Sequence, residues 1–254
     1  MLDFDMRVHV GIPARMGASR FPGKPLAKIA GKTMLEHVYK RSSLATNVSS
    51  IFIATCDDEI ATSARSYGAQ VVMTDSGIMR PGLRVAAAAE SLQIPDEDIL
   101  VIVQGDEPLV HPEMIETAVS ELVANHDFNL GTLVGLANKE EFYDKNEVKV
   151  VFNDENRILY MSRSPIPFEM TTEKISRFKQ VAVMPFRARY LQEFQTIIPR
   201  KNELIEAIEL IRALENGDKV LAIQTSRKNV SVDTPEGLIE AEYAMLKDEL
   251  YGSY

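Results

Sequence analysis

The stretch RVHVGIPARMGASRFPGKPL, residues 7–26, joins a strand pattern to a loop rich in glycine and proline. Residues 7–12 carry alternating β-branched side chains, which are typical of a buried strand. The loop that follows holds Arg15, Arg20 and Lys24 and is too broken by proline to form a helix. Three cations in so short a loop predict either a solvated turn or a site for a strongly anionic group.

After this stretch, segments with a strand pattern alternate with segments with a helix pattern up to about residue 127. Strands are expected at 50–55, 70–74 and 98–106, and amphipathic helices at 33–45, 58–68 and 83–92. Such alternation predicts an α/β fold with a doubly wound, mainly parallel, Rossmann-like sheet. Ligands of such sheets lie beyond the carboxyl ends of the strands, and both Arg15 and Asp106 fall just past a strand end.

The pattern changes after residue 127, where strands follow one another more closely. Strands at 128–136, 147–153, 157–168 and 180–186 predict antiparallel pieces added to the parallel core. One helix over 203–217 and a strand over 219–225 come next. A final helix is expected to run to about Lys247, with Asp233 or Thr234 as its cap and Pro235 in its first turn.

Composition and charge narrow the possible partners. The 254 residues carry a net charge of -9 and a pI near 5.1, which argues against a protein that coats nucleic acid. The longest apolar run is shorter than the ~20 residues of a membrane span, and the first residues lack the pattern of a signal peptide. Cys56 is the only cysteine, so we expect no intrachain disulfide and a reducing, cytoplasmic compartment.

The cationic loop does not match the common nucleotide-binding motifs. Five residues separate Gly17 from Gly23, and Pro25 stands where a Walker A motif has serine or threonine. The pattern Gly-x-Gly-x-x-Gly is also missing, so a nicotinamide cofactor is unsupported. Small residues that expose backbone N–H groups, together with Arg15 and Lys24, would still form a phosphate cradle. These residues alone leave the phosphate site and the solvated loop about equally open.

Six motifs that follow one another along the chain are together more specific for a family than any one of them alone. They are IPARMGASRFPGKPLAKIAGKTMLEHVYKR (12–41), ATCDDEI (54–60), VQGDEPLVHPEMI (103–115), VKVV (148–151), YMSRSPIPF (160–168) and VSVDTPEGL (230–238). In this order they resemble the 3-deoxy-manno-octulosonate cytidylyltransferase (CMP-Kdo synthetase) family, colinearly from residue 7 to about 245. Each motif alone is weak, whereas their combination is specific.

The resemblance implies an enzyme that transfers CMP from CTP to a Kdo-like acidic sugar, either Kdo or a variant such as 8-amino-Kdo, and releases pyrophosphate. It implies that Arg15, Lys24, Asp106 and Asp233 are catalytic. Arg15 and Lys24 would bind the triphosphate of CTP and stabilise the charge that develops on pyrophosphate, and Asp106 and Asp233 would hold Mg²⁺. Without the resemblance, Asp106 could be a turn residue and Asp233 a helix cap. Substrate binding is implied for Ser19, Arg20, Arg84, Gln104, Lys149, Arg163, Gln180, Glu209 and Arg212.

Two of these residues also have a plainer interpretation: Arg20 as a surface cation, and Lys149 as a solvated lysine opposite its valine neighbours on a strand. The resemblance further implies a homodimer built around 155–190. We therefore expect one domain over residues 1–254, in which 128–200 form a subregion for acceptor binding and dimerisation.

The chain departs from the family pattern at two places. Arg80-Pro81-Gly82-Leu83-Arg84 replaces the Ser-Gly-Thr segment and keeps only its last arginine, and Gln180-Val181-Ala182-Val183-Met184 replaces His-x-Gly-Ile-Tyr. We therefore expect an altered acceptor preference, with ordinary Kdo a poor substrate. A nucleotidyltransferase for another base, or for another acceptor such as a phosphonate, and a non-catalytic nucleotide-binding regulator remain alternatives.

Overall fold

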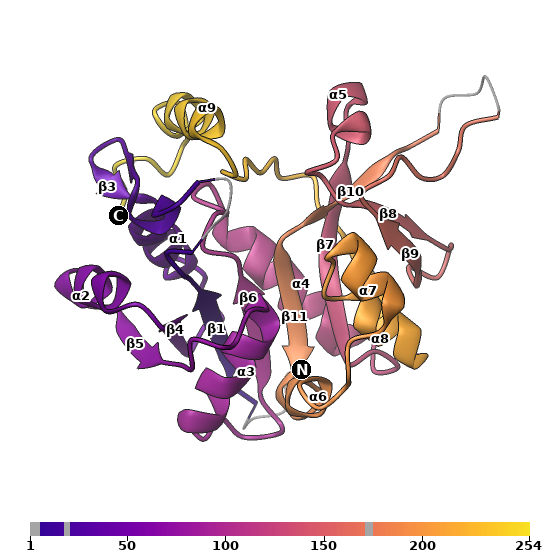
Figure 1. Cartoon of the computed structure of the whole chain (residues 1–254), viewed down its shortest axis with the longest axis horizontal. Coiled ribbons are helices and arrows are strands. Elements are labelled where there is room, and N and C mark those ends of the chain that lie inside the picture. Colours follow the sequence, from indigo (N-terminus) through magenta and orange to yellow (C-terminus); the bar gives the residue numbers. More distant parts are fainter. Residues whose placement is uncertain (1–5, 18–20, 171–174) are drawn as a thin grey trace.

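The computed structural model describes residues 6–17, 21–170 and 175–254 (Figure 1). In this part of the chain, ten strands form one mixed sheet in the order β5-β4-β1-β6-β11-β7-β10-β8-β9, with β12 paired to β7. The strands of this sheet are β1 (Val8–Pro13), β4 (Ser50–Thr55), β5 (Gln70–Met73), β6 (Ile99–Val103), β7 (Leu130–Leu136), β8 (Lys149–Phe152), β9 (Ile158–Ser162), β10 (Phe178–Val181), β11 (Val183–Arg187) and β12 (Val220–Gln224). A small hairpin joins β2 (Lys28–Ile29) to β3 (Lys32–Thr33).

Helices cover both faces of the sheet, because apolar residues of each central strand alternate between the two sides. On β6, Val101 packs into one core with α1, α2 and α4, whereas Ile102 packs into the other with α3, α6 and α8. The helices are α1 (Met34–Ser42), α2 (Asp58–Ser66), α3 (Pro81–Ser91), α4 (Pro112–Ala124), α5 (Lys139–Tyr143), α6 (Ala188–Phe194), α7 (Lys201–Glu206), α8 (Ile211–Asn216), α9 (Pro235–Met245) and the short 3₁₀ helix η1 (Lys24–Leu26). None of the helices in the described ranges is both long and apolar enough to span a membrane.

The predicted parallel core is confirmed. Strand β1 pairs in parallel with β4 and with β6, and β4 pairs in parallel with β5. All six residues of β1 and all five of β6 are buried, which explains why every residue of β6 is apolar. The carboxyl ends of these strands meet at one edge of the sheet, as in other doubly wound folds.

The added antiparallel strands are also confirmed, and they extend the same sheet. Strand β11 runs antiparallel to β6, and β10 runs antiparallel to both β7 and β8. The prediction of one strand over 180–186 is wrong, because the chain passes at Ala182 from β10 to β11, which lie on opposite sides of β7. The chain on either side of residues 171–174 extends away from the body of the molecule (Figure 1).

The prediction of a single helix over 203–217 is also wrong. The helical pattern is interrupted at Ala207, which has left-handed backbone angles (φ 54°, ψ 39°), and α7 and α8 lie on either side of it. The interruption turns Glu209 towards the first turn of α3, where its carboxylate accepts hydrogen bonds from the backbone N–H groups of Gly82 (2.9 Å) and Leu83 (3.2 Å). A tertiary contact therefore outweighs the local preference for a continuous helix.

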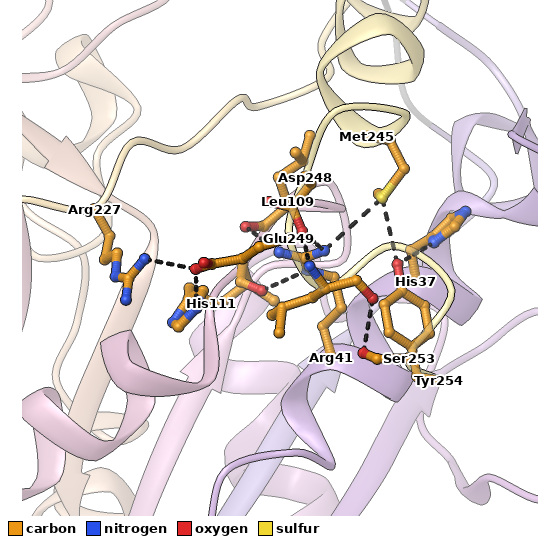
Figure 2. Close-up of polar contacts among 12 residues, drawn as sticks. His37, Arg41, Leu109, His111, Arg227, Met245, Asp248, Glu249, Ser253 and Tyr254 are labelled. Atoms are coloured by element: carbon orange, nitrogen blue, oxygen red, sulfur yellow. Dashed lines mark hydrogen bonds and ion pairs between the residues drawn. The ribbon is translucent and has the colours of Figure 1, made fainter.

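The C-terminal segment is anchored on α1 by two buried side chains (Figure 2). The fully buried Arg41 donates to Asp248 Oδ1 (2.6 Å) and to the backbone carbonyl of Val110 (2.8 Å). His37 forms a hydrogen bond with the Tyr254 hydroxyl at 2.8 Å. The end of the chain is thus tied both to α1 and to the loop between β6 and α4.

Candidate active site

Three side chains singled out from the sequence meet just beyond the carboxyl ends of β1 and β6. The Nζ atom of Lys24, in η1, lies 2.6 Å from Asp106 Oδ2 and 3.1 Å from Asp233 Oδ1. It also donates to the backbone carbonyl of Val232 at 2.9 Å. The expected convergence of Asp106 and Asp233 over one edge of the sheet is therefore confirmed.

The electrostatics of this cluster keep the lysine charged. Burial lowers the pKa of Lys24, but the charges and hydrogen bonds of Asp106 and Asp233 outweigh burial and leave that pKa above its ordinary value. The cluster therefore sets one cation against two acidic side chains, and all three are partly exposed to the cavities described below.

The loop after β6 can carry Asp106 to this place because it contains Gly105. A Cβ atom at Gly105 would lie 2.9 Å from the backbone oxygen of Pro13, at the end of β1. The N–H of Val232 in turn donates to the backbone oxygen of Asp106 at 3.0 Å. Close backbone packing thus brings together the two segments that hold the aspartates.

Sequence reasoning missed Glu107. Its carboxyl group is buried (2% exposed) and accepts hydrogen bonds from Ser231 Oγ (2.7 Å) and from the side-chain amide of Asn229. Burial, and secondly the charge of Asp106, raise the pKa of Glu107 to about 8, although its two hydrogen bonds act in the opposite direction. Two adjacent carboxylates directly after a wholly apolar strand were the signal that could have drawn attention to it.

A first cavity of about 240 Å³ opens beside the Lys24 cluster. Its wall combines the end of β1, η1, the start of α3 and the loop after β6, and it carries the cations Arg15 and Lys24. Arg84 also reaches this wall, but it is 2% exposed, and its guanidinium donates to the Thr74 hydroxyl and to the backbone oxygen of Ile78. Arg84 therefore holds the loop before α3 in place under the cavity.

A second cavity, of about 700 Å³, lies on the other side of the aspartates. Gln104, Asp106 and Asp233 line both cavities, so these three side chains stand at their junction. The cations on the second wall are Arg163 and Lys179, against nine acidic side chains. The acidic side chains are Asp106, Glu107, Glu140, Glu141, Asp144, Glu147, Asp233, Glu236 and Glu240.

Both cations of the second cavity are held firmly. Lys179 Nζ lies 2.9 Å from Glu141 Oε1 and 2.9 Å from Glu147 Oε1. Arg163 donates through Nε to the backbone oxygen of Glu206 (2.9 Å) and through Nη1 to that of Asn146 (3.0 Å). Their positions are therefore set by the protein before any ligand binds.

A third, smaller cavity of about 140 Å³ adjoins Gln104 and contains the residues that depart from the family pattern. Arg80, Gln180 and Met184 line it together with Glu209. The Gln180 amide donates to Thr132 Oγ1 at 3.1 Å. A Cβ atom at position 82 would lie 2.8 Å from Glu209 Oε1, so the glycine in Arg80-Pro81-Gly82 leaves room for the Glu209 carboxylate.

The remaining predicted residues lie differently. Lys149 is fully buried rather than solvated, because its Nζ donates to the backbone oxygens of Asp144 (2.6 Å) and Glu147 (2.7 Å). Arg212 is buried and forms a double hydrogen bond with Glu203 at 2.7 and 2.8 Å, so it lines none of the three cavities. Ser19 and Arg20 lie outside the described residues.

Comparison with known proteins identifies the family. The sequence matches the family described as cytidylyltransferase over residues 10–224. The chain belongs to this family. The 8-amino-3,8-dideoxy-manno-octulosonate cytidylyltransferase of Shewanella baltica (strain OS195) is 39% identical to it over 246 residues, which are 96% of this chain and 100% of the relative. The protein with the same description from Shewanella oneidensis is 38% identical over the same shares of the two chains.

Solved structures agree with the sequence relatives. The structure of CMP:2-keto-3-deoxy-manno-octonic acid synthetase in complex with CTP superposes with a TM-score of 0.87 at 30% identity, over 95% of this chain and 99% of that one. A cytidylyltransferase from Leptospira borgpetersenii shares the fold at 18% identity, with a TM-score of 0.60, over 95% of this chain and 85% of that one. The resemblance inferred from the six motifs is confirmed.

Proposed function

We propose that this cytidylyltransferase transfers CMP from CTP to 8-amino-Kdo, a Kdo-like sugar acid that carries an amine. The observation that carries the proposal is the Lys24–Asp106–Asp233 cluster, which stands between a cavity lined by the cations Arg15 and Lys24 and a larger cavity with room for a second substrate. Such an arrangement suits transfer of a nucleotidyl group, in which the two substrates must meet in line at the α-phosphorus.

In this proposal the first cavity holds CTP. Arg15 and Lys24 neutralise phosphate charge, and Lys24 exchanges part of its contact with the aspartates for phosphate oxygens when the nucleotide binds. As the bond between the α- and β-phosphates breaks, the same cations stabilise the charge that develops on pyrophosphate. The acceptor hydroxyl approaches from the second cavity, beside Gln104.

The residues at the junction fit a magnesium ion. Mg²⁺ binds to one or two carboxylates and completes its shell with water and substrate phosphates, so Asp106 and Asp233 are a sufficient protein contribution. Both carboxylates lie within 3.1 Å of one atom, Lys24 Nζ, which shows that they reach a common point. When bound there, Mg²⁺ would neutralise phosphate charge and lower the pKa of the acceptor hydroxyl.

The acceptor is proposed from three lines of support. The relatives at 38–39% identity are described as acting on 8-amino-3,8-dideoxy-manno-octulosonate. The second cavity offers the fixed cations Arg163 and Lys179 for a carboxylate, and an excess of carboxylates that favours an acceptor carrying an ammonium group. In the third cavity, Gln180 offers a neutral amide where the family has a histidine, and Met184 offers no hydrogen-bond donor where the family has a tyrosine, which supports a changed acceptor preference.

We further propose that the protein is a cytoplasmic homodimer and that the segment 155–190 forms the contact. Large apolar side chains are exposed there: Leu159 (57%), Phe168 (82%) and Met170 (88%). Side chains of this kind grouped on one surface are typical of protein interfaces. A closed two-fold pair is the commonest soluble assembly.

A pyrophosphate-release screen tests the function. The purified protein is assayed with CTP, UTP, ATP and GTP against 8-amino-Kdo, Kdo and a small phosphonate, with Mg²⁺ present. We expect turnover with CTP and 8-amino-Kdo far above every other combination. A preference for another nucleotide or for the phosphonate would overturn the assignment, and tight CTP binding without turnover would instead support a regulator.

A further inference from the structure

Glu107 connects the two segments that carry the aspartates of the site. It follows Asp106 directly, and its carboxyl group binds Asn229 and Ser231, which precede Asp233 by four and two residues. One buried side chain therefore joins the loop after β6 to the segment that leads into α9.

The other connections between these segments are weaker or have to change during turnover. One backbone hydrogen bond, from Val232 N to Asp106 O, links the segments directly. The contacts of Lys24 with both aspartates are shared with phosphate oxygens once CTP binds, under the function proposed above. Glu107 is only 2% exposed by contrast, and both of its hydrogen bonds are made within the protein, to the segment that leads into α9.

We propose that Glu107 is a positioning residue, which sets the separation of Asp106 and Asp233 so that both carboxylates bind one divalent cation. This inference rests on the proposed metal role of the two aspartates. Removal of a hydrogen-bond partner that orients metal ligands typically costs about 10–100-fold in metal affinity or activity. Loss of both hydrogen bonds of Glu107 is expected to fall in that range.

The test compares Glu107→Ala with Glu107→Gln. Glutamine can keep both links, because its amide oxygen accepts from Asn229 and its amide nitrogen donates to the Ser231 hydroxyl, which both donates and accepts. Mn²⁺ is the probe: its affinity is measured by electron paramagnetic resonance in the presence of CTP without acceptor. Tm and the dependence of kcat and KM on Mg²⁺ are measured alongside, with Asp106→Asn as the reference variant.

We expect Glu107→Ala to bind Mn²⁺ about 10–100-fold more weakly and to require correspondingly more Mg²⁺ for half-maximal turnover. Glu107→Gln should stay within about threefold of the parent protein in both measurements. A purely structural role would lower Tm in Glu107→Ala and leave the affinity for Mn²⁺ unchanged, and that result overturns the inference.

A double variant serves if Glu107→Ala does not fold. Asn229→Ala combined with Ser231→Ala removes the same two hydrogen bonds at positions that are less buried than Glu107. It should weaken Mn²⁺ binding to a similar extent, and an unchanged affinity overturns the inference. Unchanged Mn²⁺ binding by Asp106→Asn would show instead that the proposed metal site itself is wrong.

Discussion

The ammonium group of Lys24 lies 2.6 Å from the carboxylate of Asp106, although 82 residues separate them in the sequence. The same ammonium reaches Asp233, 209 residues away, at 3.1 Å. One charged group therefore comes to a single point from each of three segments: the first βα loop, the loop after the central strand β6, and the start of the last helix. The predictions below test what this point and its surroundings do.

Removing the charge of either aspartate should abolish most of the activity while the fold survives. We expect Asp106→Asn and Asp233→Asn each to lower kcat by several orders of magnitude, because an amide preserves the packing but binds Mg²⁺ poorly. Steady-state kinetics at limiting and saturating Mg²⁺ measure the effect. Asp154→Asn, at an exposed aspartate, is the control and should retain full activity. Near-normal turnover of either site variant at limiting Mg²⁺ would contradict the metal assignment.

Lys24→Ala should weaken binding of CTP more than binding of CMP. The lysine is a point charge at the aspartate cluster and is expected to meet the outer phosphates rather than the base. Calorimetric titration with both nucleotides gives the two affinities, and Lys28→Ala, at an exposed lysine of the same segment, serves as the control. Equal losses for CTP and CMP would argue against this placement.

Acceptor preference should depend on the carboxylates of the second cavity. We expect kcat/KM for 8-amino-Kdo to exceed that for Kdo, and Glu236→Gln combined with Glu240→Gln to reduce the ratio. The physical reason is that two charges attracting the ammonium group are removed, while the acceptor carboxylate still meets Arg163 and Lys179. Glu97→Gln, at an exposed glutamate on the opposite edge of the sheet, should leave the ratio unchanged. A parent enzyme that prefers plain Kdo would end this hypothesis.

The anchor of the C-terminal segment should contribute substantially to stability. Asp248→Asn leaves the buried Arg41 guanidinium without its counter-charge, which we expect to cost about 3 kcal/mol in the free energy of unfolding. For a chain of this size the Tm should fall by roughly 6–12 °C. The matched control is Asp127→Asn, which breaks the exposed pair with Lys219 and should change the free energy by less than about 1 kcal/mol.

The same anchor predicts a dependence on pH. Burial raises the pKa of Asp248, but the hydrogen bond and charge of Arg41 outweigh it, so the folded-state pKa lies below the ordinary value. The stabilisation is therefore present above the unfolded-state pKa and is lost as pH falls through the lower, folded-state pKa. Denaturant titrations should show a constant difference between parent and Asp248→Asn from pH 6 to 8, and a smaller one below about pH 4. A difference that grows as the pH is lowered would refute this account.

The exposed apolar side chains of 155–190 should hold two copies together. We expect light scattering to report a dimer at micromolar concentration, and Phe168→Asp combined with Met170→Asp to give a monomer, because charges in an apolar contact are costly to bury. Ile239→Asp, at an exposed apolar residue of α9, is the control and should remain dimeric. A monomeric parent protein would remove the proposed assembly.

The order of strands and helices in the first half of the chain, and most of the charged groups at its carboxyl edge, could be predicted from the sequence. A wholly apolar strand such as β6 has to be buried on both faces, in the middle of the sheet. A carboxylate that follows such a strand closely therefore lies at the carboxyl edge of the sheet, where ligands bind. For this reason Asp106, Arg15 and Lys24 were recognisable from local pattern, and the colinear motifs added the role of Asp233.

Contacts between segments that are far apart in the sequence decided those features of the fold and of the site that the sequence did not predict. The pattern of 203–217 predicts one helix, yet Glu209 caps α3 from a turn at Ala207, and the sequence holds no local signal for that contact. Lys149 reads as a solvated strand residue, but folding buries it against backbone oxygens that satisfy its charge. The sequence places Glu107 beside Asp106, but only the tertiary structure brings its hydrogen-bond partners Asn229 and Ser231 to it. Local patterns report periodicity and charge, whereas the partner of a buried polar group is chosen by packing between segments that are far apart in the chain.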